Sequence, residues 1–184
     1  MKLRVYDPRI LAIDLRHRRF GYAVYEGHRN LLDWGARVYP ATGEAEVSMA
    51  SKRLSSLLKL HSPSVMVLKQ ERWDLAQTNQ HMRALVEMTK SEAIAHSVQI
   101  RLLGDAKVRE SFRHMGCETR SEIAQALARI FPELASYVPP KRRTWQAEHP
   151  RMIVFDAIAL GLAYWHHPST EPASPLEELS SASE

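Results

Sequence analysis

The five residues from Ile10 to Asp14, Ile-Leu-Ala-Ile-Asp, constrain the fold of this chain more than any other stretch. Four consecutive apolar residues, two of them β-branched, predict a strand that is buried on both faces of a sheet. The carboxylate of Asp14 closes this run, and three arginines follow within the segment 15–20. An acid at the end of a central strand can hold a divalent metal ion beside a phosphate. It can also merely begin a turn.

The composition favours one ordinary globular domain. A chain of 184 residues with 45% hydrophobic and 25% charged residues can bury a substantial core. The single Cys117 excludes an internal disulfide framework and a cysteine-based zinc site. No apolar run approaches the roughly 20 residues that span a bilayer, and the N-terminus leads into no signal-type apolar segment. We therefore expect a cytoplasmic protein with no membrane partner.

Charge is distributed unevenly along the chain. From Pro168 onward there are four acidic residues and no Lys or Arg, so the rest of the chain carries 25 basic against 17 acidic residues. Such an excess favours an anionic partner, most commonly nucleic acid, although a solvated basic surface without a partner has the same composition. We expect residues 1–167 to form the domain and residues 168–184, rich in Pro, Ser and Glu, to be a disordered tail.

Hydrophobic periodicity predicts an α/β fold with a mixed sheet. Three strands are expected in an antiparallel meander, followed by helices that alternate with parallel strands. The Thr119 and Glu122 side chains form a capping-box pattern at the start of one helix. The expected strands are 10–14, 21–26, 31–39, 65–68 and 98–103, and the expected helices are 44–60, 75–97, 105–115, 119–131 and 152–165.

Three acids share an unusual context. Asp14 ends the first strand, Glu71 lies just beyond the strand 65–68, and Asp156 lies early in the last helix. Each interrupts an otherwise apolar segment, where an ionised carboxylate is costly unless it is paired or bound to metal. Carboxylates from two adjacent strands and a covering helix could converge on one or two metal ions, an arrangement that cleaves phosphodiesters by activating water.

Two stretches resemble a known family. The opening 10–24, continued by Leu-Leu-Asp-Trp-Gly at 31–35, and the ending 155–163 are similar to RuvC-type Holliday junction resolvases, which belong to the ribonuclease H-like superfamily. The resemblance implies a ribonuclease H-like mixed sheet flanked by helices. It also implies cleavage of branched DNA that depends on Mg²⁺ or Mn²⁺, usually by a homodimer.

The sequence departs from that family at the residues that matter for catalysis. Leu15-Arg16 follows the first acid in place of the family's usual Pro-Gly, and Lys69 stands where the second acid is expected. Ile153 occupies the place of a further acid one turn before Asp156. Only Asp14 and Asp156 therefore match the family's acids directly. Glu71 shares a strand face with Lys69 only if the strand continues past it.

Three functional hypotheses follow. The first is a metal-dependent, structure-selective endonuclease with Asp14, Glu71 and Asp156 as catalytic metal ligands. The second is a catalytically degenerate relative that binds branched or duplex DNA without cutting it, which the ammonium of Lys69 near the metal position favours. The third is a scaffolding protein whose basic excess has no partner. The expected nucleic-acid contacts are Arg16, Arg18, Arg19, Lys69, Lys141, Arg142 and Arg143.

Overall fold

A computed structural model describes residues 8–141, 143, 145 and 147–167 of the chain. The predicted tail 168–184 lies outside the described residues. The strands are β1 (Arg9–Arg16), β2 (Arg19–Glu26), β3 (Asn30–Val38), β4 (Val65–Lys69) and β5 (Gln99–Leu103). The helices are α1 (Gly43–His61), α2 (Gln70–Leu75), α3 (Gln80–Ala95), α4 (Asp105–Arg113), α5 (Arg120–Ile130), the 3₁₀ helix η1 (Pro132–Tyr137) and α6 (Met152–His166).

The five strands form one mixed sheet in the order β3-β2-β1-β4-β5. β1, β2 and β3 pair antiparallel as a meander, and β4 and β5 run parallel to β1. This arrangement confirms the predicted α/β class and the three-stranded meander. Ile13 pairs with Leu68, so the next residues on the two strands, Asp14 and Lys69, lie on neighbouring strands. Lys69 ends β4, whereas β1 continues to Arg16, so Asp14 does not end the first strand as predicted.

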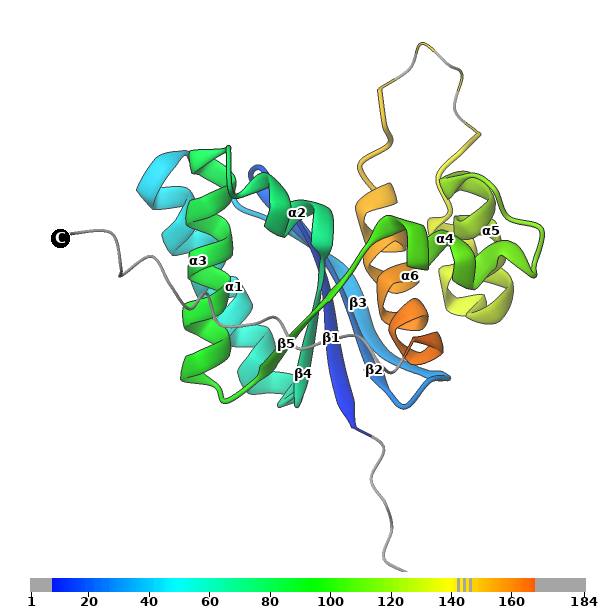
Figure 1. Cartoon of the computed structure of the whole chain (residues 1–184). Helices are drawn as coiled ribbons and strands as arrows, with labels where there is room; N and C mark the ends of the chain where they lie inside the picture. Colours follow the sequence, from blue (N-terminus) through cyan, green and yellow to red (C-terminus); the bar gives the residue numbers. More distant parts are fainter. Residues whose placement is uncertain (1–7, 142, 144, 146, 168–184) are drawn as a thin grey trace, which may run out of the picture.

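Helices cover both faces of the sheet (Figure 1). Along β1, Ile10 and Ala12 pack against α4, α5 and α6, whereas Leu11 and Ile13 pack against α1 and α3. All four side chains are fully buried, because a central strand between two helical layers has no solvent face. Asp14 continues the alternation of Ile10 and Ala12, so its side chain lies on the face covered by α6.

Two glycines allow α6 to approach the sheet closely. A Cβ added to Gly21, the β2 residue paired with Asp14, would lie 2.2 Å from the carbonyl oxygen of Ile153. A Cβ on Gly161 of α6 would lie 2.5 Å from the ring of Tyr25 on β2. No side chain fits at either position. The first turn of α6 is therefore pressed against β2 beside Asp14, which brings Asp156 to the same place.

The segment after β4 differs from the prediction. The strand ends at Lys69, and Gln70 begins the short helix α2, which is followed by α3 from Gln80. The condition under which Glu71 would share a strand face with Lys69 is therefore not met, because the period of two ends where the helix begins. A strand followed directly by a helix requires no turn residue, which is why the charged run 69–72 gave no signal of the change.

The remaining local predictions can be compared directly. The capping box at α5 is present: the Thr119 side chain accepts the N–H of Glu122, whose carboxylate accepts the N–H of Thr119. α4 begins at Asp105, the residue at which the predicted helix 105–115 begins, and its N-cap is Gly104. Within the described residues, no helix is both long and apolar enough to cross a membrane. The expected homodimer stays a prediction.

Candidate nucleic-acid interface and carboxylate site

The structure brings two of the three predicted acids together. Asp14 on β1 is completely buried and Asp156 on α6 is 8% exposed. One nitrogen of Arg16, Nη2, donates to both carboxylates, at 2.8 Å to Oδ2 of Asp14 and 2.7 Å to Oδ2 of Asp156. The two acids thus approach the same guanidinium group, which lies between them.

Asp14 has a second basic partner. Besides Nη2, the Nε of Arg16 donates to its Oδ2 at 3.0 Å, and the Nε of Arg72 on α2 donates to its Oδ1 at 3.2 Å. Arg16 reaches Asp14 because residues two apart on a strand point to the same face. Arg72 reaches it because α2 starts directly at the end of β4, the strand beside β1. Both oxygens of Asp14 therefore accept from guanidinium groups.

Asp156 is held in a similar way. Arg120, the first residue of α5, donates from Nε to Oδ1 at 2.9 Å and from Nη2 to Oδ2. A further acid, Glu148, joins the group by accepting a 2.7 Å hydrogen bond from Nη1 of Arg16 and by pairing with Arg120. We call these six side chains the guanidinium network; its members are Asp14, Arg16, Arg72, Arg120, Glu148 and Asp156.

The network perturbs the ionisation of its members. Burial raises the pKa of Asp156 more than the hydrogen bond from Arg120 and the charge of Lys69 lower it. Burial alone would raise the pKa of Glu148, but hydrogen bonding from Arg16 and the charge of Arg120 hold it below its ordinary value. Burial opposes the charge on Arg16, yet its carboxylate neighbours raise its pKa further above the ordinary range. Arg16 is therefore a permanent cation at the centre of the site.

Lys69 lies near Asp156 but forms its ion pair with Asp105. Its side chain is buried and its Nζ lies 3.1 Å from Oδ1 of Asp105 at the start of α4. It lines a cavity of about 30 Å³ together with Arg120 and Asp156. The positive charge of Lys69 acts to lower the pKa of Asp156, against the larger effect of burial, although no ion pair joins the two side chains.

Glu71 does not join Asp14 and Asp156. It is an exposed residue in the first turn of α2, and its Oε1 accepts the backbone N–H of Asp105 at 2.7 Å. This hydrogen bond satisfies one of the free N–H groups at the start of α4 and places an acid near a helix N-terminus, where it is favourable. Glu71 thus caps the start of α4. This contact does not support its predicted role as a metal ligand.

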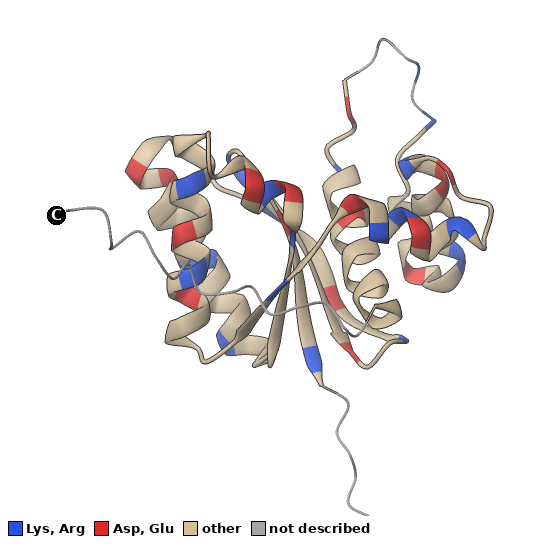
Figure 2. Cartoon of the chain, viewed as in Figure 1, with Lys and Arg blue, Asp and Glu red and all other residues tan. Residues whose placement is uncertain are grey.

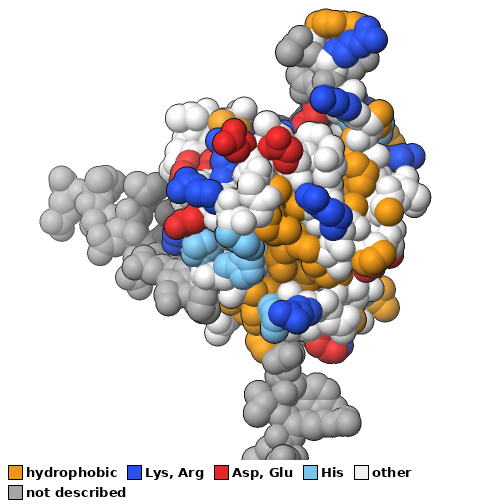
Figure 3. Space-filling view, turned by 90° about the vertical axis from the view of Figure 1, so that its right-hand side faces the viewer, with side chains coloured by type: hydrophobic (Ala, Val, Ile, Leu, Met, Phe, Trp, Pro, Cys, Tyr) orange, Lys and Arg blue, Asp and Glu red, His pale blue; other side chains and the backbone are white. Residues whose placement is uncertain are grey.

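The predicted nucleic-acid contacts are dispersed over the molecule. Arg16 and Lys69 are engaged with carboxylates. Arg18 lies in the turn between β1 and β2, and Arg19 is the first residue of β2. Lys141 and Arg143 are exposed on the connection between η1 and α6. Arg142 lies outside the described residues. Figure 2 shows both signs of charge along α2, α4 and α5, and Figure 3 shows basic side chains scattered over the face that α4 and α5 form. The connection to α6 projects beyond the body of the domain (Figure 1).

The donor set does not fit the metal ions that the resemblance implies. Mg²⁺ and Mn²⁺ bind carboxylate or carbonyl oxygens that no other cation occupies. Here all four oxygens of Asp14 and Asp156 accept from arginine: Oδ1 of Asp14 from Arg72, Oδ1 of Asp156 from Arg120, and both Oδ2 atoms from Arg16. The guanidinium groups stand where a cation would have to bind, so the arrangement is complete without a metal.

Sequence reasoning missed half of the network. Arg72, Arg120 and Glu148 come from three separate segments, and no spacing in the sequence relates them to Asp14 or Asp156. The contact between Asp14 and Arg16 did have a signal, because both lie on one strand two positions apart. A base on the same strand face as a buried acid indicates a pair, and such a pair makes a free metal ligand less favourable.

No family model and no curated protein matches the chain by sequence. Solved structures do match it. It is similar to Thermus thermophilus RuvC in complex with a Holliday junction substrate (TM-score 0.66, 16% identity), covering 90% of this chain and 99% of that one. It is also similar to the yeast mitochondrial Holliday junction resolvase Ydc2 (TM-score 0.53, 14% identity), covering 88% of this chain and 80% of that one. A third similar structure is the Fowlpox virus resolvase bound to Holliday junction DNA (TM-score 0.52, 12% identity), covering 86% of this chain and 99% of that one.

These similarities, together with the mixed sheet and its two helical layers, define the chain as a protein with a ribonuclease H-like fold. Within that class its fold is RuvC-like, because the similarity to Thermus thermophilus RuvC extends over nearly the whole of both chains. At 12–16% identity the comparisons establish the fold alone.

Proposed function

We propose that this protein is a RuvC-like nucleic-acid-binding protein in which arginines replace the catalytic metal ions, so that it binds branched or duplex DNA without cleaving it. One observation carries the proposal: the guanidinium groups of Arg16, Arg72 and Arg120 occupy every oxygen of the two buried acids. Three arginines also balance the charges of the three acids, Asp14, Glu148 and Asp156, so the site attracts no further cation.

The energetics favour the arginines over a hydrated dication. Removing one partner of a buried ion pair costs about 3–5 kcal/mol, because the other charge is left uncompensated in a medium of low polarity. A magnesium ion would have to displace Arg16 from both acids and also give up part of its own tightly held water. Arg16 has a pKa far above neutrality and cannot leave by losing its proton. Arg16 therefore remains a cation at any physiological pH.

Support for a nucleic-acid partner comes from the rim of the cleft and from the charge of the domain. The side chain of Arg120 is 43% exposed while it pairs with Asp156, and Arg109 is an exposed residue that lines the same small cavity. Guanidinium groups at a cleft mouth present the planar fork that binds phosphate oxygens. Two of the similar structures are complexes with Holliday junction DNA, which supports the choice of branched DNA as the first ligand to test.

The decisive experiment measures binding and cleavage separately. Fluorescence anisotropy with a labelled four-way junction and a duplex of the same length, in EDTA and in Mg²⁺, reports binding. A gel assay on the same end-labelled junction, over a range of Mg²⁺ and Mn²⁺ concentrations, reports cleavage. We expect binding that does not require metal and no cleavage under either metal. Metal-dependent cleavage that Asp14→Asn abolishes would overturn the proposal. Absence of DNA binding at low salt would also overturn it.

A second candidate is the metal-dependent junction endonuclease. It is favoured by the convergence of three acids, Asp14, Glu148 and Asp156, on the single side chain of Arg16. If substrate phosphate drew the arginines away, these carboxylates would become available. The experiment above separates the two functions, since this candidate requires cleavage in the presence of both DNA and Mg²⁺ or Mn²⁺.

A further inference from the structure

A second cluster of ionisable side chains lies away from the guanidinium network. It consists of His17 in the turn between β1 and β2, Glu46 in the first turn of α1 and His81 in the first turn of α3. The Nδ1 of His17 lies 2.9 Å from the Nε2 of His81. Oε2 of Glu46 lies 3.4 Å from the first of these nitrogens, and Oε1 lies 3.2 Å from the second.

Glu46 is the unusual member of this cluster. It is completely buried, and its Oε1 accepts the backbone N–H of Arg18 at 2.6 Å. Its Oε2 is also buried but has no hydrogen-bond partner within the described part of the chain. A buried carboxylate oxygen without a partner is costly, and such atoms usually mark a site that an ion or water completes. This oxygen lies nearest the ring of His17, whereas Oε1 lies nearest the ring of His81.

The local backbone is arranged to hold this carboxylate. Arg18 has a positive φ of 61°, a conformation that is unfavourable for a residue with a side chain. In this conformation its N–H points at Glu46, and the preceding residue, His17, is presented beside the starts of α1 and α3. The three donors thus come from three elements that are separate in the sequence and meet at one point.

The distances match the ligand set of a transition metal. With bonds of about 2.0–2.1 Å, two ligands of a tetrahedral zinc ion lie ~3.3 Å apart. The two ring nitrogens lie 2.9 Å apart, and each lies 3.2 or 3.4 Å from a different oxygen of Glu46. With one ligand atom taken from each residue, the three atoms all lie within 4.8 Å of one another. Two imidazoles and one carboxylate form a ligand set of catalytic zinc sites, which keep a fourth position open. Nitrogen ligands select against Mg²⁺ and Ca²⁺, which prefer oxygen.

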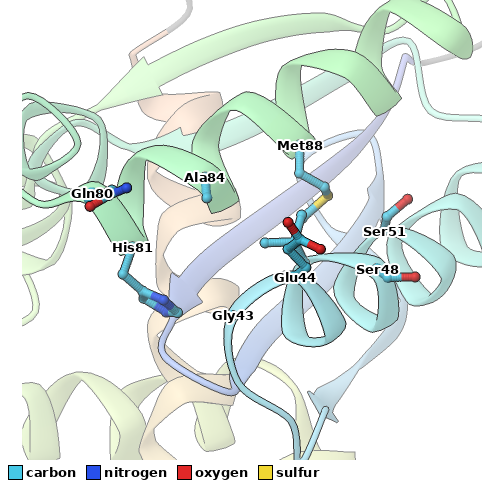
Figure 4. A pocket seen from close by; sticks show the side chains of 9 residues that line it. Gly43, Glu44, Ser48, Ser51, Gln80, His81, Ala84 and Met88 are labelled. Atoms are coloured by element: carbon cyan, nitrogen blue, oxygen red, sulfur yellow. The ribbon is translucent and has the colours of Figure 1, made fainter.

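We propose that His17, Glu46 and His81 bind a zinc-class divalent transition metal, with one coordination position open to solvent. His17 is 58% exposed, so an ion can enter without unfolding any element. His81 also lines a groove of about 900 Å³ between α1 and α3, and Figure 4 shows its ring extending from α3 toward Gly43 at the start of α1. The open position therefore lies at one end of a groove lined by Val47 and Met88, where a ligand could reach the metal.

A metal-free interpretation of the cluster makes different predictions. In that case Glu46 would be compensated only by a protonated histidine, and the cluster would show no preference for zinc over magnesium. The distance between the two ring nitrogens is also compatible with a hydrogen bond between one protonated and one unprotonated nitrogen. A metal titration distinguishes these interpretations, because only the proposed site gives a stoichiometric complex with zinc.

The test uses the full chain, treated with EDTA and desalted. Isothermal titration with ZnCl₂ measures stoichiometry and affinity, and Co²⁺ absorption spectra report a four-coordinate nitrogen and oxygen site. We expect one equivalent of zinc and no competition from millimolar Mg²⁺. Loss of an outer-shell partner alone weakens metal sites by roughly 10- to 100-fold, so His17→Ala, which removes a ligand, should weaken binding at least that much.

His28→Ala is the matched control, because His28 is an exposed histidine in the turn at the opposite end of β2. It should bind zinc as the native chain does. Absence of zinc binding in the native chain, equal affinity in His17→Ala, or equal losses in both variants would each overturn the proposal. His17 is exposed, so the variant should fold, and circular dichroism checks this. None of these measurements involves DNA, so their outcome is independent of the function proposed for the carboxylate site.

Discussion

Arg16 and Asp156 lie 140 positions apart in the chain, yet the Nη2 of Arg16 donates to Oδ2 of Asp156 at 2.7 Å. The same nitrogen donates to Asp14 on its own strand, so one guanidinium group joins β1 to α6. In a RuvC-like fold the two acids meet because α6 crosses β1 and β2 at close range. In this chain the meeting point is filled by a side chain that cannot lose its charge.

Replacing Arg16 should destabilise the fold. In Arg16→Ala, Asp14 and Asp156 keep their burial but lose their shared cation, and we expect a loss of about 3 kcal/mol in the free energy of unfolding. Urea denaturation at pH 7 measures it. Arg53→Ala, at an exposed position of α1, is the control and should change stability by less than about 0.5 kcal/mol. Similar values for the two variants would show that the network does not stabilise the fold.

The same substitution should create affinity for magnesium. Native protein is expected to show no Mg²⁺ binding by calorimetry, whereas Arg16→Ala should bind it weakly through Oδ2 of Asp14, whose guanidinium donors both come from Arg16. Adding Lys69→Glu removes an ammonium from the cleft and adds an acid at the end of β4. This second change should strengthen binding by tenfold or more, since each ~1.4 kcal/mol of interaction changes affinity tenfold. Tight Mg²⁺ binding by the native chain would contradict the arginine-filled site.

Much of the fold could be predicted because its signals are local. The apolar run 10–13 predicted a strand buried on both faces, and the Thr119 capping box marked the start of α5 correctly. Asp14 and Asp156 stood out because acids inside apolar segments need a partner. Apart from Arg16, the identity of their partners was beyond the sequence, since Arg72 and Arg120 reach the two acids only through tertiary packing.

Two features of the structure could not be predicted from the sequence, for physical reasons. The segment 69–72 is polar enough to suit a strand end or a helix start, and β4 passes into α2 with no intervening turn. Glu71 therefore lies in the first turn of α2, where its side chain accepts a hydrogen bond from the first residue of α4. The cluster of His17, Glu46 and His81 was missed because its members come from three elements and share no spacing motif.

The ionisation of Glu148 should make stability depend on pH. Burial opposes the charge of Glu148, but hydrogen bonding from Arg16 lowers its pKa below the ordinary value of 4.5. Its contribution is therefore present above that value and is lost as the pH falls through the lower pKa of the folded state. The stability difference between native protein and Glu148→Gln should be largest near pH 7 and vanish in acid. Denaturation curves from pH 7 to pH 3 measure it, with Glu110→Gln at an exposed position of α4 as control.

The connection between η1 and α6 should contribute to DNA binding through its basic side chains. Lys141→Ala combined with Arg143→Ala should weaken junction binding. It should also make the slope of log K against log salt concentration shallower by up to about 2, because each phosphate that is no longer neutralised accounts for ~0.9 of that slope. Anisotropy titrations at four salt concentrations measure this slope. Lys52→Ala combined with Arg53→Ala removes the same charge from α1 on the other face of the domain. An equal effect of both double variants would indicate binding by net charge alone.

The close approach of α6 to β2 should be essential to the carboxylate site. In Gly21→Ala the new methyl group would overlap the carbonyl oxygen of Ile153 at 2.2 Å, which is backbone and cannot turn aside. We expect α6 to shift, the contact between Arg16 and Asp156 to lengthen, and stability to fall by about 3 kcal/mol or more, at the upper end of overpacking effects. Gly35→Ala is the matched control, because its methyl group would meet only the Tyr22 side chain, at 3.2 Å. Thermal unfolding of both variants measures the difference, and equal losses would show that the spacing between β2 and α6 is not tightly set by Gly21.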